Sequence, residues 1–287
     1  MNPRVQLGDF EVIGLLDGHF ALDGGAMFGT IPRTLWQRRN PPDDQNRVVM
    51  GLRSLLVRGS GMTVLIETGL GRHHNPTFIE RFRVEQGAGL IGAMAAEGVA
   101  PEDVDLVINS HLHWDHAGGN THILNGSAVP AFPRATYVVQ QSNWLEAHQT
   151  HERNQASYRP VDFEPIDAAG QLRLIDGEVG SEILVAPGIS VERVDGHAVG
   201  LQVVYVDGGG QRLCFLTDVA PTSSHLDYPW IMGYDLYPVT TLETKKRLLP
   251  RAAADGWLGA FVHDPEHAFG RVQMDERKRP VYVPLTD

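Results

Sequence analysis

The sequence predicts an α/β (α+β) fold in which two β-sheets pack face to face, with helices on the outside. Short apolar, β-branched runs bounded by turn residues recur along the chain, and only a few helical segments lie between them. No repeat, low-complexity tract or clear linker divides the 287 residues. Since a sheet must bury its apolar face against another layer, many short strands with few helices favour a two-sheet core. We therefore expect residues 1–287 to form a single domain.

The N-terminal half is expected to be mainly strands, with two helices. Apolar runs between turn residues predict strands at 5–16, 53–58, 62–66, 104–109 and 135–139. Turn residues end the first strand at Asp17-Gly18 and join the second and third strands as a hairpin. An alanine-rich helix at 90–97 is stopped by Gly98, and Ser142 is the expected cap of the other helix.

The C-terminal half alternates short strands with glycine turns. The same signals predict strands at 183–186, 189–194, 201–206, 212–216, 257–262, 268–272 and 281–283. One helix is expected at 241–254. The polar segment 150–170 contains Pro160 and Pro165, and it is expected to be a loop or a mobile cover.

The charge balance bears on the kind of partner. The net charge is −11 at pH 7 and 42% of the residues are hydrophobic, which is ordinary for a globular protein with a sizeable core. Nucleic acids and anionic membranes select basic patches, so the acidic balance argues against both. The expected partner is a small-molecule substrate. A homodimer is compatible with the sequence.

The single cysteine and the lengths of the apolar runs bear on disulfide chemistry and on cellular location. The one cysteine, Cys214, lies in a predicted strand, so no intrachain disulfide forms and a buried structural thiol is expected. The N-terminus shows no apolar run of signal-peptide length, and no stretch approaches the roughly 20 apolar residues of a membrane span. A cytoplasmic protein is therefore expected.

Four candidate metal ligands lie within six positions, directly after the strand at 104–109: His111, His113, Asp115 and His116. Residues two apart in an extended segment point the same way, so His111 and His113 can reach one metal ion together. Asp115 and His116 follow a change of chain direction and are expected to serve a second ion. Neutral imidazole with carboxylate is the ligand set of zinc-type sites.

The string His-x-His-x-Asp-His-x-Gly-Gly at 111–119 resembles the signature of metallo-β-lactamase-fold hydrolases. The branch it most resembles contains the N-acyl-homoserine lactonases and methyl parathion hydrolase. The resemblance covers residues from about 50 to 270 and implies a four-layer αββα sandwich of two mixed β-sheets, with metal ions at one edge between the sheets. The family usually has Asp-Thr-Gly where this chain has Glu67-Thr68-Gly69. Glu67 would then support a metal ligand without binding the ion, while Gly118 and Gly119 let the backbone turn tightly.

The resemblance also implies three further ligands, each after a predicted strand: His197, Asp218 and His263. The implied ligand sets are His111, His113 and His197 for one metal, Asp115, His116 and His263 for the other, and Asp218 as the bridge between them. Two divalent ions per chain are expected, with zinc as the default. Histidine and carboxylate ligands also accept manganese, iron or cobalt.

Two such ions about 3.5–4 Å apart share a water and lower its pKa toward neutrality. The resulting bridging hydroxide would attack an electrophilic carbonyl or phosphorus. Asp115 is the expected catalytic residue that handles the proton, because it is both a ligand and a carboxylate.

The substrate class follows from the resemblance and remains open between alternatives. A lactone or ester hydrolase that degrades quorum signals comes first, followed by a phosphotriesterase resembling methyl parathion hydrolase and by a glyoxalase II-like thioesterase. A metal-binding protein that has lost turnover is the non-enzyme alternative. Some lactonases carry a tyrosine shortly after the bridging aspartate; here Tyr228 or Tyr234 is the expected substitute. Met27 and Phe28, in a glycine-rich loop, are read either as surface residues or as a wall of the substrate pocket.

Overall fold

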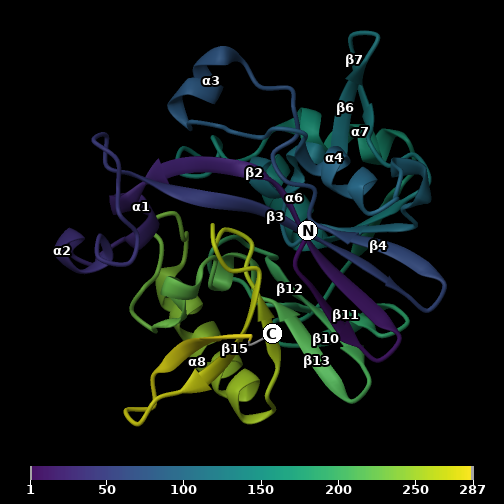
Figure 1. Ribbon diagram of the computed structural model, residues 1–287. Helices are drawn as coiled ribbons and strands as arrows, with labels where there is room; N and C mark the ends of the chain where they lie inside the picture. The colour runs from purple at the N-terminus through teal and green to yellow at the C-terminus, as the bar shows by residue number, and fades with distance from the viewer. Residues whose placement is uncertain (1, 286–287) are drawn as a thin grey trace.

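A computed structural model describes residues 2–285, whose strands form two seven-stranded sheets and one small hairpin (Figure 1). In spatial order, the first sheet consists of β1 (Arg4–Leu7), β2 (Phe10–Asp23), β3 (Arg47–Gly59), β4 (Met62–Ile66), β5 (Leu106–Ile108), β8 (Thr136–Gln140) and β9 (Leu172–Ile175). Its first four strands pair antiparallel, and β4, β5, β8 and β9 pair parallel. The first sheet is therefore mixed, as the sequence predicts.

In the second sheet, the strands lie side by side in the order in which they occur along the chain. It consists of β10 (Glu182–Ala186), β11 (Ile189–Arg193), β12 (Gln202–Gly208), β13 (Gln211–Phe215), β14 (Leu258–Ala260), β15 (Phe269–Met274) and β16 (Pro280–Pro284). All neighbouring strands pair antiparallel except β13 and β14, which are parallel. The long helix α8 (Pro238–Ala254) makes the crossover that this parallel pair requires.

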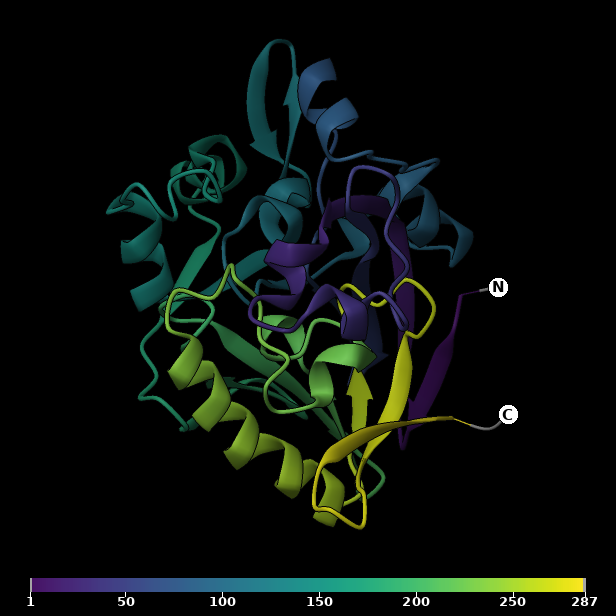
Figure 2. The same ribbon diagram turned by 90° about the vertical axis from the view of Figure 1, so that its left-hand side faces the viewer.

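The remaining helices are short and lie outside the sheets or at their edge. They are α1 (Gly24–Phe28), α2 (Arg33–Trp36), α3 (Pro76–Arg81), α4 (Gly89–Ala96), α5 (Trp114–Ala117), α6 (Gln141–His148) and α7 (Pro160–Ala168). In Figure 2, α8 runs along the outer side of the second sheet. The hairpin of β6 (Thr121–Leu124) and β7 (Ser127–Pro130) projects from the opposite end of the molecule.

The strands are buried on both faces, which explains the layer order. Leu55 of β3 packs into the cluster between the two sheets, whereas its neighbour Leu56 packs outward with Met94 of α4. On the second sheet, Val204 faces the first sheet and Tyr205 faces Leu248 of α8. Successive side chains of a strand point to opposite faces, so each strand contributes to an inner and an outer core. The predicted αββα sandwich is thereby confirmed.

The structure differs from the predicted elements at several places. β2 does not end at Asp17-Gly18, because a bulge there keeps the strand paired with β3 through to Asp23. The segment 150–170, predicted as loop, contains α7, in which Pro160 stands in the first turn, where its missing N–H costs nothing. Ser142 does not cap α6, whose N-cap is Gln140. The predicted strand at 5–16 is divided between β1 and β2. The hairpin of β6 and β7, the strand β9 and the short helices α1, α2 and α3 were not predicted.

Within residues 2–285, no helix is both long and apolar enough to cross a membrane. Cys214 lies buried in β13, as predicted.

Candidate metal centre

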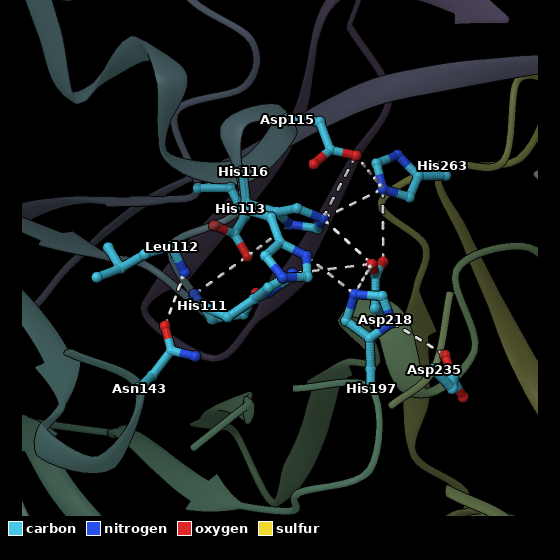
Figure 3. A network of polar contacts seen from close by, with 12 residues as sticks. His111, Leu112, His113, Asp115, His116, Asn143, His197, Asp218, Asp235 and His263 are labelled. Atoms are coloured by element: carbon cyan, nitrogen blue, oxygen red, sulfur yellow. Dashed lines mark hydrogen bonds and ion pairs between the residues drawn. The ribbon is translucent and has the colours of Figure 1, made fainter. Parts of the chain in front are cut away.

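The metal motif begins where β5 ends and turns into the short helix α5 (Figure 3). His113 has extended backbone (φ −65°, ψ 150°), and its ring centroid lies 4.3 Å from that of His111. Asp115 and His116 belong to α5, so their side chains leave the backbone in another direction. The change of direction predicted between the two pairs is therefore present.

The other three predicted ligands come from the ends of second-sheet strands. His197 lies between β11 and β12, Asp218 lies in a 3-10 turn after β13, and His263 follows β14. Their side chains reach the motif, as Figure 3 shows. Among the described residues, three groups have candidate ligand atoms within 4.8 Å of one another: His111 with His113 and His197, Asp115 with His116 and His263, and Glu67 with His111 and His116. The first two groups are the ligand sets that the resemblance implies, and they fit a metal site.

Asp218 lies between the two groups. One carboxylate oxygen, Oδ2, lies 3.1 Å from His197 Nε2 and 3.4 Å from His116 Nε2, which belong to different groups. The other oxygen, Oδ1, lies 3.4 Å from His263 Nε2. The preceding Thr217 has φ +48°, a left-handed conformation that is costly for a β-branched residue. This costly turn at the end of β13 presents the Asp218 carboxylate to both groups.

The imidazole lone pairs indicate that a cation fits here. His263 Nδ1 lies 2.9 Å from the carbonyl oxygen of Gly51, and His116 Nδ1 lies 3.3 Å from Glu67 Oε1, so both nitrogens must donate. In the neutral rings, the two Nε2 atoms then carry lone pairs, yet they face each other at 3.2 Å. A positive ion between them would turn this repulsion into two ligand bonds.

The pKa shifts of the other side chains also indicate that a cation fits at this centre. Burial lowers the pKa of His111 and of His113 well below the ordinary value, which keeps the ligand form, neutral imidazole. His111 Nε2 is also buried without a hydrogen-bond partner among the described residues. Burial opposes ionisation of Asp218, but His116, His197 and His263 outweigh it and hold the pKa of that carboxyl well below its usual value.

The pKa values of two other histidines, His116 and His197, are raised instead of lowered. Burial lowers the pKa of His116, but the carboxylates of Asp218, Asp115 and Glu67 together raise it well above the ordinary value. Burial likewise opposes protonation of His197, while Asp218 and Asp235 raise its pKa. The carboxylates therefore favour positive charge at these two nitrogens, which a metal ion can supply in place of a proton.

Hydrogen bonds to the ring nitrogens that point away from the centre orient the histidine ligands. Asp235 Oδ1 accepts from His197 Nδ1 at 2.9 Å and leaves Nε2 facing the centre. Glu67, one methylene longer than the family aspartate, accepts from the backbone N–H of Ser110 at 3.1 Å and faces His116. Its φ of +64° is another left-handed conformation of a non-glycine residue beside the site. Glu67 thus lies where the resemblance places it.

Asn143 of α6 links two ligand loops. Its Oδ1 accepts from the backbone N–H of Leu112 at 2.9 Å, and its Nδ2 donates to the carbonyl oxygen of Val199 at 2.8 Å. Leu112 separates His111 from His113, and Val199 lies two residues after His197. One fully buried amide therefore fixes the spacing of the first ligand group.

Gly118 and Gly119 serve close approach more than turning. Gly118 has ordinary helical angles (φ −60°, ψ −30°). A Cβ atom at Gly118 would lie 2.1 Å from the carbonyl oxygen of Leu70, and one at Gly119 would lie 2.1 Å from that of Thr68. Any side chain here would push the metal motif away from the segment that carries Glu67.

A pocket of about 380 Å³ opens above the ligands. Its lining includes ligands of both groups and Asp218, together with apolar residues such as Leu22, Trp114 and Met232. A larger hollow of about 660 Å³ lies elsewhere, and among the described residues none of the predicted ligands lines it. The smaller pocket is therefore the candidate substrate site.

The structure separates the four predicted pocket residues. Met27 and Tyr234 line the pocket. Phe28 instead stacks on Trp36 and on His225 inside the core, because the two side chains leave the short helix α1 in different directions. Tyr228 packs against the core beneath α8 and does not line the pocket. The prediction is thus wrong for Phe28 and Tyr228 as pocket residues.

Lys245 of α8 anchors the loop that carries the pocket wall. Its side chain is fully buried, and Nζ donates to the carbonyl oxygens of Asp227 at 2.7 Å and Trp230 at 3.0 Å. This loop continues to Tyr234 and Asp235. Burial lowers the pKa of Lys245 to about 7, against the opposing effect of Asp235 and Asp227. The buried amine therefore loses its proton more readily than an exposed lysine does.

Sequence reasoning missed Asp235, Asn143 and Lys245. Each acts through a contact with a residue far away in the chain, such as the 38-position separation of Asp235 from His197. A lone aspartate in a loop gives no periodicity or motif that would single it out.

Comparison with known proteins agrees with this centre. The sequence profile of the metallo-beta-lactamase superfamily matches residues 53–258, which is more than half of the chain. The chain belongs to the metallo-beta-lactamase superfamily, and it is a metal-dependent hydrolase of that class with lactonases among its relatives.

Individual relatives are distant in sequence and similar in fold. The N-acyl homoserine lactonase AttM of Azorhizobium caulinodans is 26% identical over 185 residues, which cover 64% of this chain and 66% of AttM, slightly under two thirds of that protein. A probable metal-dependent hydrolase from Staphylococcus aureus has a TM-score of 0.88 at 26% identity, over 99% of both chains. The dizinc quorum-quenching lactonase AidC, in complex with a product, has a TM-score of 0.79 at 18% identity, over 100% of this chain and 98% of AidC. The AidC likeness concerns the fold.

Replacing Asp235 by asparagine is expected to weaken one metal site selectively. Asparagine keeps the size of the side chain but removes the charge that favours a donating Nδ1 on His197. Loss of such a partner typically lowers metal affinity by about 10- to 100-fold. Competition with a fluorescent chelator should show one weakened zinc equivalent and one unchanged. Asp255→Asn, at an exposed residue, is the matched control; equal zinc affinities in Asp235→Asn and wild type would contradict the role of Asp235.

Proposed function

We propose that this chain is a single-domain dinuclear hydrolase, by default a zinc enzyme, that opens lactones of the N-acyl-homoserine type. The observation that carries the proposal is the position of Asp218, whose carboxylate lies within 3.4 Å of imidazole nitrogens from both ligand groups. A carboxylate shared in this way is suited to two ions rather than one. His111, His113 and His197 would hold the first ion, and Asp115, His116 and His263 the second.

When bound, the two ions would lower the pKa of a shared water and polarise the carbonyl under attack. Asp115 would handle the proton. Its Oδ2 lies 3.5 Å from His263 Nε2, and Oδ1 remains to accept a proton and return it to the leaving oxygen. Asp115 also lines the pocket, so its carboxylate meets the substrate.

Tyr234 would supply a neutral hydrogen-bond donor to the substrate. Partial desolvation, with Asp23 and Asp115, raises the pKa of Tyr234 to about 12, although 40% of the residue is exposed, so the phenol keeps its proton at neutral pH. It lines the same pocket as Asp115. Tyr234 is therefore suited to the place that a tyrosine nearer to the bridging aspartate takes in some lactonases.

We favour lactones over other electrophiles as the substrate class because AttM, a relative at 26% identity, is an N-acyl homoserine lactonase. The pocket supports this choice, since its apolar walls suit an acyl chain. The biological role would then be degradation of signal lactones by a cytoplasmic enzyme that requires neither nucleic acid nor membrane, either as a monomer or as a homodimer.

Proton release by metal-replete protein tests the proposal, on a panel of acyl-homoserine lactones, simple lactones, aryl esters, thioesters and phosphotriesters. We expect lactone turnover well above all other classes. Turnover of triesters alone would instead make the protein a phosphotriesterase, and turnover of thioesters alone a glyoxalase II-like enzyme. Bound metal without hydrolysis of any class would support a binding protein that has lost turnover.

A further inference from the structure

Arg153 is the one arginine or lysine among the described residues that line the pocket. Apart from the metal centre, that lining is largely apolar, with Leu22, Phe82 and Trp114 among its walls. A charged donor in an apolar pocket usually fixes the orientation of a polar ligand group.

The structure holds Arg153 in place from two sides. Its Nη2 donates to the carbonyl oxygen of Gly233, on the opposite wall, at 2.9 Å. Its own segment is fixed to the metal motif, because the backbone N–H of Trp114 donates to the carbonyl oxygen of Ser157 at 3.0 Å. Asn154 Oδ1 accepts from the backbone N–H of His151 at 2.8 Å and closes the turn that carries Arg153. These contacts limit the motion of the Arg153 side chain, which lines the pocket while remaining exposed to solvent.

Arg153 has no ion-pair partner among the residues that the structure describes. Among residues 2–285, no carboxylate lies within ion-pair distance of its guanidinium group, and its one side-chain hydrogen bond is to Gly233. Nη1 and Nε therefore retain donors for a ligand. Nη2 uses one of its two hydrogens on Gly233, so four of the five guanidinium N–H donors remain for an acceptor on a ligand, and the amide oxygen of an N-acyl arm is such an acceptor.

We propose that Arg153 binds the amide carbonyl oxygen of a lactone side arm and so selects N-acyl lactones over lactones with a plain alkyl arm. This inference rests on the proposed lactonase function. With the ring carbonyl at the metal centre, the side arm follows the apolar walls, and its amide oxygen meets the free N–H groups of Arg153. Arg153 is a specificity residue: it contacts the substrate away from the bond that breaks.

The test compares two lactones of equal length, N-octanoyl-homoserine lactone and an alkyl γ-lactone without the amide. For Arg153→Ala, we expect KM for the N-acyl lactone to rise about tenfold, the size of effect that one charge-assisted hydrogen bond typically supplies. KM for the alkyl lactone and kcat for both should stay within about twofold of wild type. Arg153→Lys, which keeps the charge, should recover part of the difference. Arg134→Ala, at an exposed residue, is the control.

An equal change for both lactones would show that Arg153 only braces Gly233, and no change for either would remove its role; both results overturn the proposal. Binding of the ring-opened products, measured by calorimetry, separates this proposal from the proposed function. If wild type binds N-octanoyl-homoserine at least tenfold more tightly than Arg153→Ala does but opens neither lactone, the subsite stands and the lactonase proposal fails. If Arg153→Ala binds it as tightly as wild type, the subsite proposal fails whether or not lactones are opened.

Discussion

Replacing Asp218 by alanine is expected to abolish metal binding and hydrolysis together, with kcat/KM lowered by about 1,000-fold or more. The Asp218 carboxylate lies between both ligand groups, 3.1 Å from His197 Nε2 and 3.4 Å from the Nε2 atoms of His116 and His263. Without it, both ions would lose a ligand and the buried imidazoles would lose their shared negative charge. Removing several kcal/mol of transition-state stabilisation corresponds to a rate loss of this size.

Elemental analysis after gel filtration measures the first half of this prediction, and proton release measures the second. Wild type should retain two ions per chain, and Asp218→Ala fewer than one. Asp167→Ala changes an exposed aspartate on α7 and should behave as wild type. An Asp218→Ala protein that keeps two tightly bound ions would overturn the bridging assignment.

Replacing Lys245 by methionine is expected to lower the free energy of unfolding by about 3 kcal/mol at pH 7. The change leaves the partly buried carbonyl oxygen of Asp227 and the buried one of Trp230 without their donor, and an unsatisfied buried group costs about 1–3 kcal/mol. The loop that carries Tyr234 and Asp235 should loosen as well, so activity should fall with stability. Urea unfolding at a fixed metal concentration measures the effect.

The pH dependence of this effect has a definite sign. Burial lowers the pKa of Lys245 to about 7, whereas the unfolded lysine has a pKa of about 10.4. Between these values the unfolded chain binds more protons than the folded one, so the contribution of Lys245 to stability rises with pH and is lost as pH falls through about 7. The difference between wild type and Lys245→Met should therefore widen by about 2 kcal/mol from pH 7 to pH 9.

Lys246 is the matched control for this series, since it is adjacent to Lys245 on α8 but its side chain is half exposed. Lys246→Met should change stability by less than about 0.5 kcal/mol at either pH. A difference between wild type and Lys245→Met that narrows as pH rises would contradict the account of the buried amine.

The sandwich was predictable because its strands are regular and its inner layer is apolar. Runs such as Leu213–Leu216 pack toward one layer and then the other, and each carries the β-branched or apolar residues that this requires. The metal motif was predictable because its ligands lie within six positions. α7 was not predicted because prolines such as Pro160 and Pro165 usually interrupt a helix. Here Pro160 lies in the first turn of α7, and Pro165 lies at an interior position that the helix tolerates.

The residues that hydrogen-bond to the metal ligands and their loops could not be predicted from the sequence, for a different reason. Asp235 and Asn143 each act through hydrogen bonds to loops that only the folded sheets bring together. The pocket residues divide in the same way. Met27 reaches the pocket and Phe28 does not, because the turn of α1 between these adjacent residues is set by packing against Trp36.

Anomalous diffraction from crystals of the zinc-loaded protein tests the central claim most directly, because it locates the ions and their ligands together. The account predicts two peaks about 3.5–4 Å apart. One should lie within bonding distance of His111, His113 and His197, the other within that of Asp115, His116 and His263, with the Asp218 carboxylate between them. A single peak, or a second ion bound by Glu67 in place of Asp115, would contradict the two-metal centre proposed here.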